Sequence, residues 1–587
     1  MLPASDQTGA AKSRQLKRWG PIIGIVAVAA IVIGIVASSG DDKKTATPTT
    51  TTTAPAASTT ASASTSAGAT TTKGAPAPIT YPLRFSEARA KGITVDWSKS
   101  CNTDLGQVKL PDYFAPECVA PFTGDNGGAT AQGVTKDTIK IVYYQSQQGD
   151  PVISYVTDAI KNDDTNAQYE ESMRGYIKMY ESVVETYGRH VELTVVVGSG
   201  ITTDPVAARA DAVKIAEVDK PFMVWGGPAL TDAFAEELAA RKIPCIGCGP
   251  GQPQDVEAQR APYALSITAS AEQTQQHAVE YITKQLTGKP AAHAGDPALV
   301  STTRKFGYVH LESSEAAKKL ADQFSADMKA GGAELAVSIP YQLNPATIQE
   351  TAASTIAKLK QAGVTSVLLN GDPVAPRDFT KEATAQGYFP EWILTGSVLV
   401  DTTAFSRSYD QKQWAHAFGL TTLSARTNPQ TGGSYFLYKW FTGKEVPAKN
   451  SSGVIQPTPS VFYAGLQLAG PNLTAQSFQD GFFNAPPTKP GISVPGFSFG
   501  DKGIWKATDY NGIDDATVMW WDATATGEDE IRRTGTGMWT YIDGGKRYLP
   551  GAWPSVDKAF VKEGAVTIYE NRPPGEEPPV YPSPAAG

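Results

Sequence analysis

The chain has 587 residues, 41% of them hydrophobic and 19% charged, and its formal net charge is −8. This composition is typical of a large globular protein with an ample core, and the lack of a basic stripe argues against a nucleic-acid partner. The five histidines show no ligand spacing such as HExxH, so the sequence predicts no metal site and disfavours a histidine-based metal enzyme.

Residues 21–38 carry no charge and follow a basic leader, residues 1–20. A run of about 18 apolar residues is close to the shortest that spans a bilayer, and basic residues before it keep the N-terminus in the cytoplasm. The segment is either a retained transmembrane anchor or a signal cleaved near Ala37-Ser38-Ser39, and its length favours the anchor. Both alternatives place the rest of the chain outside the cytoplasm, either tethered to the cell membrane or secreted. The first cysteine is Cys101, which excludes a lipid-modified cysteine beside the span.

Two segments have compositions that favour disorder. Residues 39–80 are rich in Thr, Ala, Ser and Pro and cannot bury enough apolar surface to fold. They form a linker, interpreted either as an O-glycosylated stalk or as a plain spacer. Residues 561–587 form a proline-rich tail, which we expect to be disordered after Asn571.

The four cysteines predict disulfides, because an even number in an oxidising compartment is typical of paired thiols. Cys101 and Cys118 lie in a segment before the main domain, residues 81–132, and we expect them to pair there.

The other two, Cys245 and Cys248, form a Cys-x-x-Cys motif that allows redox, zinc and disulfide interpretations. A four-cysteine zinc site needs the first pair alongside. A local disulfide is favoured, with Gly247 and Gly249 supplying the turn that such a close pair requires.

From residue 138, short apolar runs alternate with amphipathic helices. The helix predicted over Asn166–Tyr187 keeps apolar residues at i, i+3 and i+4 spacing and ends at Gly188. The other elements predicted in this half are the strands Ile139–Tyr144, Val191–Val197, Pro221–Trp225 and Ile243–Ile246 and the helices Pro205–Val218 and Thr231–Arg241.

The alternation repeats in a second half. Its predicted strands are Phe306–Leu311, Leu335–Ile339, Val364–Leu369 and Trp392–Thr395, and its predicted helices are Ala271–Leu286, Ser314–Ala330, Ile348–Gln361 and Ala375–Gln386. Alternation of this kind indicates βαβ units, parallel sheets and right-handed crossovers. Two successive runs indicate two Rossmann-like lobes. After Gly396 the sequence predicts helices at Gly432–Phe441, Ser460–Leu468 and Ala475–Phe483, and strands and turns from Pro495 onward.

This order resembles the type I periplasmic binding proteins, specifically the branched-chain amino-acid (leucine-binding) substrate-binding family of ABC transporters. The resemblance covers about residues 133–525 and rests on order and spacing. The segments that carry it are Gly133–Ile141, Trp225–Pro228, Ile243–Gly247, Tyr263–Tyr281, Phe306–His310, Val364–Asp372, Gly387–Trp392, Phe497–Gly503 and Val518–Asp522, the last two as a closing hairpin.

The resemblance implies an α/β fold of two Rossmann-like lobes with parallel sheets and a hinge. Its implied bounds are residues 133–266 and 396–495 for lobe 1, and residues 267–395 and 496–560 for lobe 2. A small ligand binds between such lobes, where the carboxyl ends of the strands converge. A ligand carboxylate there meets backbone N–H groups and the positive end of a helix dipole, and a hinge motion closes the lobes.

Ten residues at the strand ends are candidate ligand contacts by position. They are Gly227, Ala229, Thr231, Gly249 and Gly251 in lobe 1, and Ser313, Ser314, Glu315, Asp372 and Ser397 in lobe 2. Glycine backbone donors suit a carboxylate, and Glu315 or Asp372 suits an ammonium group. The loop after the third strand is Gly-Pro-Ala-Leu rather than hydroxyl-rich, and no aromatic residue lies near Glu315, which leaves amino-acid specificity open.

Enzyme interpretations are weaker than a binding role. Gly496-Phe497-Ser498-Phe499-Gly500 matches GxSxG, but that motif needs a helix after the serine and a later histidine, and His416 is the last histidine. Gly247, Gly249 and Gly251 do not form a dinucleotide fingerprint, and no Walker loop is present. The acidic group at residues 528–530 lacks calcium-ligand spacing. The sequence therefore predicts a protein without catalysis and without a cofactor.

The leading interpretation is a membrane-tethered, extracytoplasmic solute-binding protein that captures a small polar ligand, an amino acid or a related compound, for the permease subunits of an ABC importer. The alternative is a ligand-sensing or scaffolding module on the cell surface with no role in transport. The absence of a lipid-modified cysteine favours this alternative to some extent.

Overall fold

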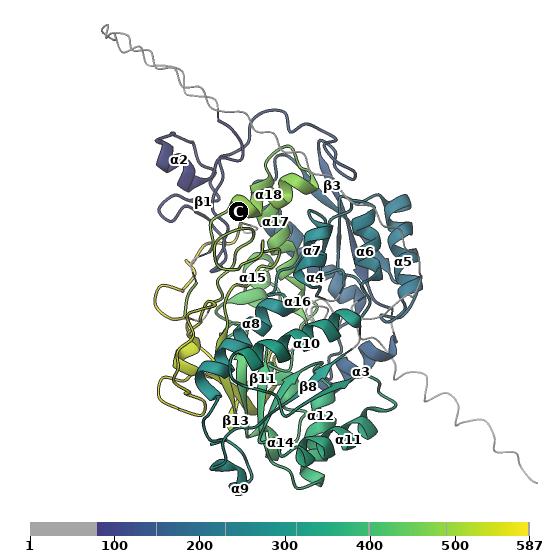
Figure 1. Cartoon of the computed structure of the whole chain (residues 1–587). Helices are drawn as coiled ribbons and strands as arrows, with labels where there is room; N and C mark the ends of the chain where they lie inside the picture. Colours follow the sequence, from purple (N-terminus) through teal and green to yellow (C-terminus); the bar gives the residue numbers. More distant parts are fainter. Residues whose placement is uncertain are drawn as a thin grey trace, which may run out of the picture.

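The computed structural model describes residues 79–147, 149–228, 230–249, 251–312, 314–396, 399–488, 490–492 and 494–584. The leader, the predicted span at 21–38 and the linker up to residue 78 lie outside these residues. Within the described part of the chain, no helix combines the length and the apolar character needed to cross a membrane. The chain folds into two α/β lobes, one above the other in Figure 1.

Lobe 1 is built on a parallel sheet of five strands in the order β4-β3-β5-β6-β7. The predicted strand at Ile139–Tyr144 becomes β3, which pairs along its whole length with β4, from Thr138 opposite His190 to Gln145 opposite Val197. A parallel sheet needs helices on both faces, which explains the nearly continuous apolar run of β3. The strands are β3 Thr138–Gln145, β4 His190–Val197, β5 Met223–Trp225, β6 Cys245–Ile246 and β7 Ala264–Leu265.

The longest helix of lobe 1, α4, begins with a capping box. Thr165 Oγ1 accepts a hydrogen bond from the Gln168 N–H, and the Gln168 side chain accepts one from the Thr165 N–H. The apolar face of α4 packs in one core with the late helices α15 to α18. The helices of this lobe are α4 Asn166–Glu181, α5 Pro205–Lys214 with a π-helical extension Ile215–Asp219, α6 Ala233–Ala240, α7 Gln254–Arg260, α15 Gly433–Thr442, α16 Ser452–Ile455, α17 Pro457–Ala469 and α18 Ala475–Asn484.

Lobe 2 has a sheet of seven strands in the order β9-β8-β10-β11-β12-β13-β14. The first five are parallel, and β13 and β14 continue the sheet as an antiparallel hairpin. The strands are β8 Phe306–Leu311, β9 Val337–Tyr341, β10 Ser366–Asn370, β11 Glu391–Thr395, β12 Ala417–Thr421, β13 Thr517–Glu528 and β14 Thr534–Tyr541.

Apolar side chains alternate between the two faces of this sheet, as the period of a strand requires. Val367 and Leu369 of β10 lie in the core that includes α11 and α12, whereas Leu368 lies in the core that includes α8 and α10. The helices are α8 Ala271–Tyr281 with a π-helical extension Ile282–Leu286, α9 Pro297–Val300, α10 Glu315–Ala330, α11 Ile348–Gln361, α12 Ala375–Ala385, α13 Thr403–Ser406 and α14 Gln411–Trp414, followed late in the chain by a 3₁₀ turn at Ile542–Gly545.

The structure corrects the predicted bounds of the lobes. The chain does not return to lobe 1 at residue 396, because β12 pairs in parallel with β11 of lobe 2, and the return comes only with α15. The closing hairpin is β13–β14, not residues 497–503 with 518–522. Phe499 packs in the core of lobe 1, although residues 496–560 were assigned to lobe 2. The pairing of β12 with β11 joins residues about 25 positions apart, and local patterns do not specify such a partner.

The segment before lobe 1 contains helix α2, Phe85–Lys91, and the short strands β1, Cys101–Asn102, and β2, Gln107–Val108. The predicted disulfide between Cys101 and Cys118 is present. The described part of the C-terminal tail is packed and hydrogen-bonded, contrary to the predicted disorder. Trp440 Nε1 donates to the Tyr581 carbonyl at 2.8 Å, and Asn102 Nδ2 donates to the Tyr581 hydroxyl at 2.9 Å.

Candidate functional site

The loops at the carboxyl ends of the two sheets face each other. α7, which follows β6 in lobe 1, meets α10, which follows β8 in lobe 2, with Lys319 Nζ 3.6 Å from a carboxylate oxygen of Asp255. The Gln254 N–H also donates to Glu272 Oε2 at 2.9 Å. Leu230, after β5, lies in the core of lobe 2. The sheet edges that face each other in this way form the interlobe face, where two-lobed α/β proteins bind ligands.

Four of the five predicted site residues of lobe 1 are described, and some of them serve local structure. Gly227 is buried, and it must be glycine because a Cβ there would come within 2.3 Å of the Cys248 carbonyl oxygen. Thr231 is 2% exposed, and its hydroxyl accepts a hydrogen bond from the Ala233 N–H at the start of α6. Gly249 and Gly251 are half-buried in the loop after β6. Ala229 lies outside the described residues.

In lobe 2, Asp372 does not face an open site. It is 0% exposed, one of its oxygens accepts from the Val374 and Ala375 N–H groups, and the other accepts from the Tyr341 hydroxyl at 2.7 Å. Burial raises the pKa of Asp372 above its usual value. These bonds make it the cap of the loop that leads into α12, and an ammonium ligand could reach it only if that loop moved.

Ser314 and Glu315 begin α10. The Ser314 hydroxyl accepts from the Ala317 N–H at 3.0 Å and caps the helix. Glu315 is exposed in the first turn, where its charge complements the helix dipole. Ser313 and Ser397, also predicted as ligand contacts, lie outside the described residues.

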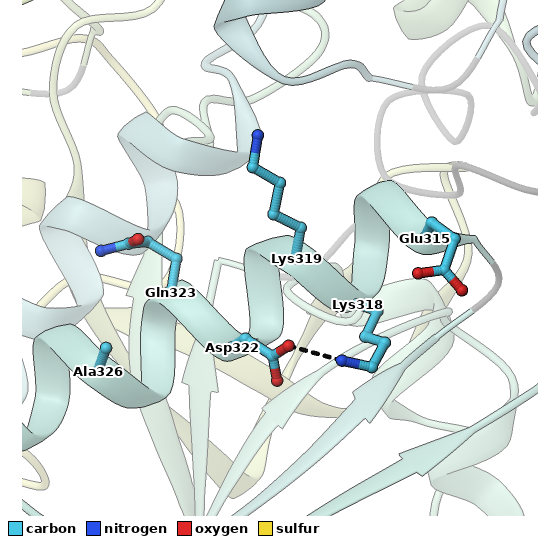
Figure 2. Close-up of a pocket in the computed structure, with 6 residues that line it drawn as sticks. All are labelled: Glu315, Lys318, Lys319, Asp322, Gln323 and Ala326. Carbon is cyan, nitrogen blue, oxygen red and sulfur yellow. Dashed lines mark hydrogen bonds and ion pairs between the residues drawn. The ribbon is translucent and has the colours of Figure 1, made fainter. Parts of the chain in front are cut away.

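Glu315 also borders a surface hollow of about 330 Å³. Its six lining residues all belong to α10, and Figure 2 shows Lys318 and Asp322 joined in an ion pair while Lys319 points to another side of the helix. A hollow lined by a single helix does not enclose a ligand. We therefore assign it no binding role.

Two helices on the interlobe face, α3 and α7, are not among the elements predicted from the sequence. Helix α3, Pro151–Ile160, leaves the end of β3 and packs into lobe 2 (Figure 1). A signal was available in the sequence: Asp150 followed by proline starts a helix, and Ile153, Val156 and Ile160 follow at helical spacing.

Buried acidic groups gather where the chain crosses between the lobes. Asp509 is 1% exposed, accepts from Gln273 Nε2 at 2.7 Å and has one oxygen with no described partner. Glu257 accepts from Asn511 Nδ2 at 2.7 Å. Burial raises the pKa of Asp509 to about 8 and that of Glu257 to about 8. The described residues include no group of three or more His, Cys, Asp or Glu side chains arranged to hold a metal ion.

The Cys-x-x-Cys motif forms the predicted local disulfide, with the two Cα atoms 5.9 Å apart. Gly247 lies between the cysteines with φ of 69°, a conformation that glycine adopts without strain. The disulfide holds the loop after β6 beside Gly227. It therefore shapes the interlobe face of lobe 1.

Comparison with known proteins agrees with this geometry. Residues 169–433 match the family described as "Periplasmic binding protein", a span that begins in α4 of lobe 1 and includes every parallel strand of lobe 2. The predicted resemblance to periplasmic binding proteins is therefore confirmed. This is a family of solute-binding proteins and not of enzymes. No curated protein sequence matches the chain.

Among solved structures, similar ones include a solute-binding protein of an ABC transporter from Rhodopseudomonas palustris in complex with 3,4-dihydroxybenzoic acid, 14% identical, covering 70% of this chain and 98% of that one with a TM-score of 0.47. Another is a fatty acid ABC transporter substrate-binding protein from Thermomonospora curvata, which is 16% identical. The match covers 74% of this chain and 100% of that one, with a TM-score of 0.47. The branched-chain amino acid transporter substrate-binding protein LivJ from Streptococcus pneumoniae, in complex with isoleucine, is 12% identical. The match covers 69% of this chain and 100% of that one, with a TM-score of 0.45.

Proposed function

We propose that this chain, which carries a periplasmic-binding-protein domain over residues 169–433, is an extracytoplasmic solute-binding protein that captures a small polar ligand between its lobes. The observation that carries the proposal is the interlobe face, where loops after β3, β5 and β6 of one lobe meet elements after β8, β10 and β11 of the other. Backbone N–H groups and helix N-termini gather at such an edge and suit an anionic group of the ligand.

The proposal includes tethering to the cell membrane by residues 21–38 and delivery of the ligand to the permease of an ABC importer. The charge pattern of residues 1–38 supports the tether. The ligand contacts we propose are the backbone of Gly249 and Gly251 and the side chain of Glu315, because these residues are on the interlobe face and are not buried. Asp372 and Thr231 support the loops instead.

Binding without transport, as a surface sensor or scaffold, is the second candidate function. One observation favours it: helix α3 and the C-terminal tail add contacts to the two-lobed fold, and Tyr581 of the tail joins Trp440 of lobe 1 to Asn102 of the first segment. These segments extend the surface beyond the two lobes and offer a partner protein a place to dock.

A ligand screen tests the proposal. The full-length protein in detergent is heated with a panel of amino acids, small carboxylates, hydroxybenzoates, amides and sugars, and unfolding is followed by the fluorescence of its 11 tryptophans. A ligand at 100 times its Kd adds about 2.7 kcal/mol to the free energy of unfolding. The proposed site is supported if Glu315→Gln reduces the stabilisation by a ligand and the distant surface substitution Glu350→Gln does not. Absence of any hit across the panel contradicts capture of a ligand of these classes.

A further inference from the structure

Helix α3 belongs to lobe 1 by connection but to lobe 2 by packing. Ile153 and Ile160 are each 4% exposed and lie in the same core as Val374, Phe379 and Phe405 of lobe 2. α3 is also in contact with α13, the helix that follows β11. Its apolar face therefore rests on the carboxyl end of the lobe 2 sheet.

Both ends of α3 are fixed to lobe 1. At the start, Asp150 caps the helix with one oxygen and accepts from the Thr202 N–H of the loop after β4 with the other, at 2.5 Å. After the helix, Asn162 Nδ2 donates to the Ser451 hydroxyl at 2.9 Å. The Asn450 N–H donates to an oxygen of Asp164 at 2.8 Å. The helix cannot follow lobe 2 away from lobe 1 without breaking these bonds.

Polar groups of lobe 2 hold the side and the end of the helix. Arg377 lies over the ring of Tyr155, 5.2 Å from its centroid, and donates to its hydroxyl at 2.8 Å. Arg533, at the tip of the β13–β14 hairpin, donates to the carbonyls of Ile160 and Lys161. The second contact satisfies carbonyls that every helix leaves free at its C-terminal end.

We infer that α3 is an intramolecular clamp that ties the two lobes together and covers the β10–β11 end of the interlobe face. This inference rests on the proposed function, because it assigns regulation to the same site. Val374 and Ala375, just after β10, are each 0% exposed and lie in the same core as Ile153 and Ile160 of the docked helix. A ligand that uses this part of the face binds only molecules in which α3 is undocked. Its apparent affinity is therefore its intrinsic affinity multiplied by the fraction of such molecules.

The test measures the distance between the lobes in the full-length protein. Exposed positions on each lobe, Val218→Cys and Val300→Cys, carry spin labels; all four native cysteines are in disulfides, so only the new thiols react. The clamp is weakened by Ile153→Ser with Ile160→Ser. If that pair prevents folding, Tyr155→Phe with Arg533→Gln removes only the polar contacts. Val206→Ser, 77% exposed on α5, is the matched control.

We expect one narrow distance distribution for the wild type and the control, and a broad or shifted one for the clamp variants. We also expect a compound that binds in the ligand panel to bind the clamp variants at least about tenfold more tightly than the wild type. An unchanged distribution in both clamp variants overturns the inference. Equal affinity of the same compound for wild type and clamp variants overturns the covering role. A broadened distribution without any binding leaves the clamp supported and contradicts the proposed function instead.

Discussion

Glu257 gives the sharpest prediction, because it is a buried acid with few compensating contacts. It is 7% exposed on α7 and accepts one hydrogen bond, from Asn511. Burial raises its pKa to about 8, the carboxylates of Glu272 and Asp509 act in the same direction, and Arg260 opposes them. The folded protein therefore keeps Glu257 protonated at pH values where the unfolded chain has ionised it.

The sign of the effect follows from proton binding. Between about pH 4.5 and pH 8 the folded state binds one proton more than the unfolded state at this position. The free energy of unfolding therefore falls as the pH rises, by about 1.4 kcal/mol per pH unit. Glu257→Gln keeps the neutral form at every pH and can still accept the bond from Asn511. We expect its stability advantage over the wild type to grow by about 2 to 3 kcal/mol from pH 5.5 to pH 7.5.

Urea unfolding at several pH values, followed by tryptophan fluorescence, measures this difference. The control is Glu350→Gln, an exposed carboxylate on α11, which should leave the pH dependence of stability unchanged. A Glu257→Gln advantage that stays constant between pH 5.5 and pH 7.5 would refute the reasoning, since it would mean that Glu257 ionises alike in both states.

Three further predictions concern other contacts of the fold. His277 accepts from Trp553 Nε1 and donates to the Asp514 carbonyl, and burial lowers its pKa to about 4. As the pH drops, the unfolded chain protonates this histidine at a higher pH than the folded protein does. The free energy of unfolding should therefore fall between about pH 6.5 and pH 4. Urea unfolding of His277→Gln should show a weaker dependence of stability on pH over this range. Glu391→Ala removes both close hydrogen bonds of the buried Arg304 guanidinium to Glu391, leaving Asp557 at 3.4 Å, and should lower the free energy of unfolding by about 3–5 kcal/mol. Deleting residues 572–587 removes both bonds to Tyr581 and should lower Tm by several degrees in a thermal scan.

Local signals in the sequence were enough for the regular elements. The predicted helix Ser314–Ala330 corresponds to α10, Glu315–Ala330, and the predicted strand Phe306–Leu311 is β8 with the same bounds. The apolar period, a capping serine and a closing pair of glycines are contained in these segments themselves. The pairing of β12 with β11 and β13 depends on residues about 25 and 100 positions away, and no local pattern encodes such a partner.

The candidate site was harder to predict, because position at a strand end does not determine which way a side chain turns. Asp372 was placed correctly after β10, yet its oxygens are used by Val374, Ala375 and Tyr341. An aspartate three residues before the first residue of a helix can also accept hydrogen bonds from the N–H groups at the helix start. Only the three-dimensional contacts distinguish the two roles. Glu315 also has its predicted place, and it remains exposed.

The segment that controls access to the interlobe face lies outside the part of the chain that matches the family. The match begins at residue 169, whereas α3 ends at Ile160, and its partner Arg533 lies beyond residue 433. The matched span therefore contains neither α3 nor Arg533. Ligand affinity in a two-lobed protein depends on the free energy difference between its open and closed arrangements. Because α3 adds contacts to the docked arrangement, weakening α3 should change that free energy difference without any change in the binding residues.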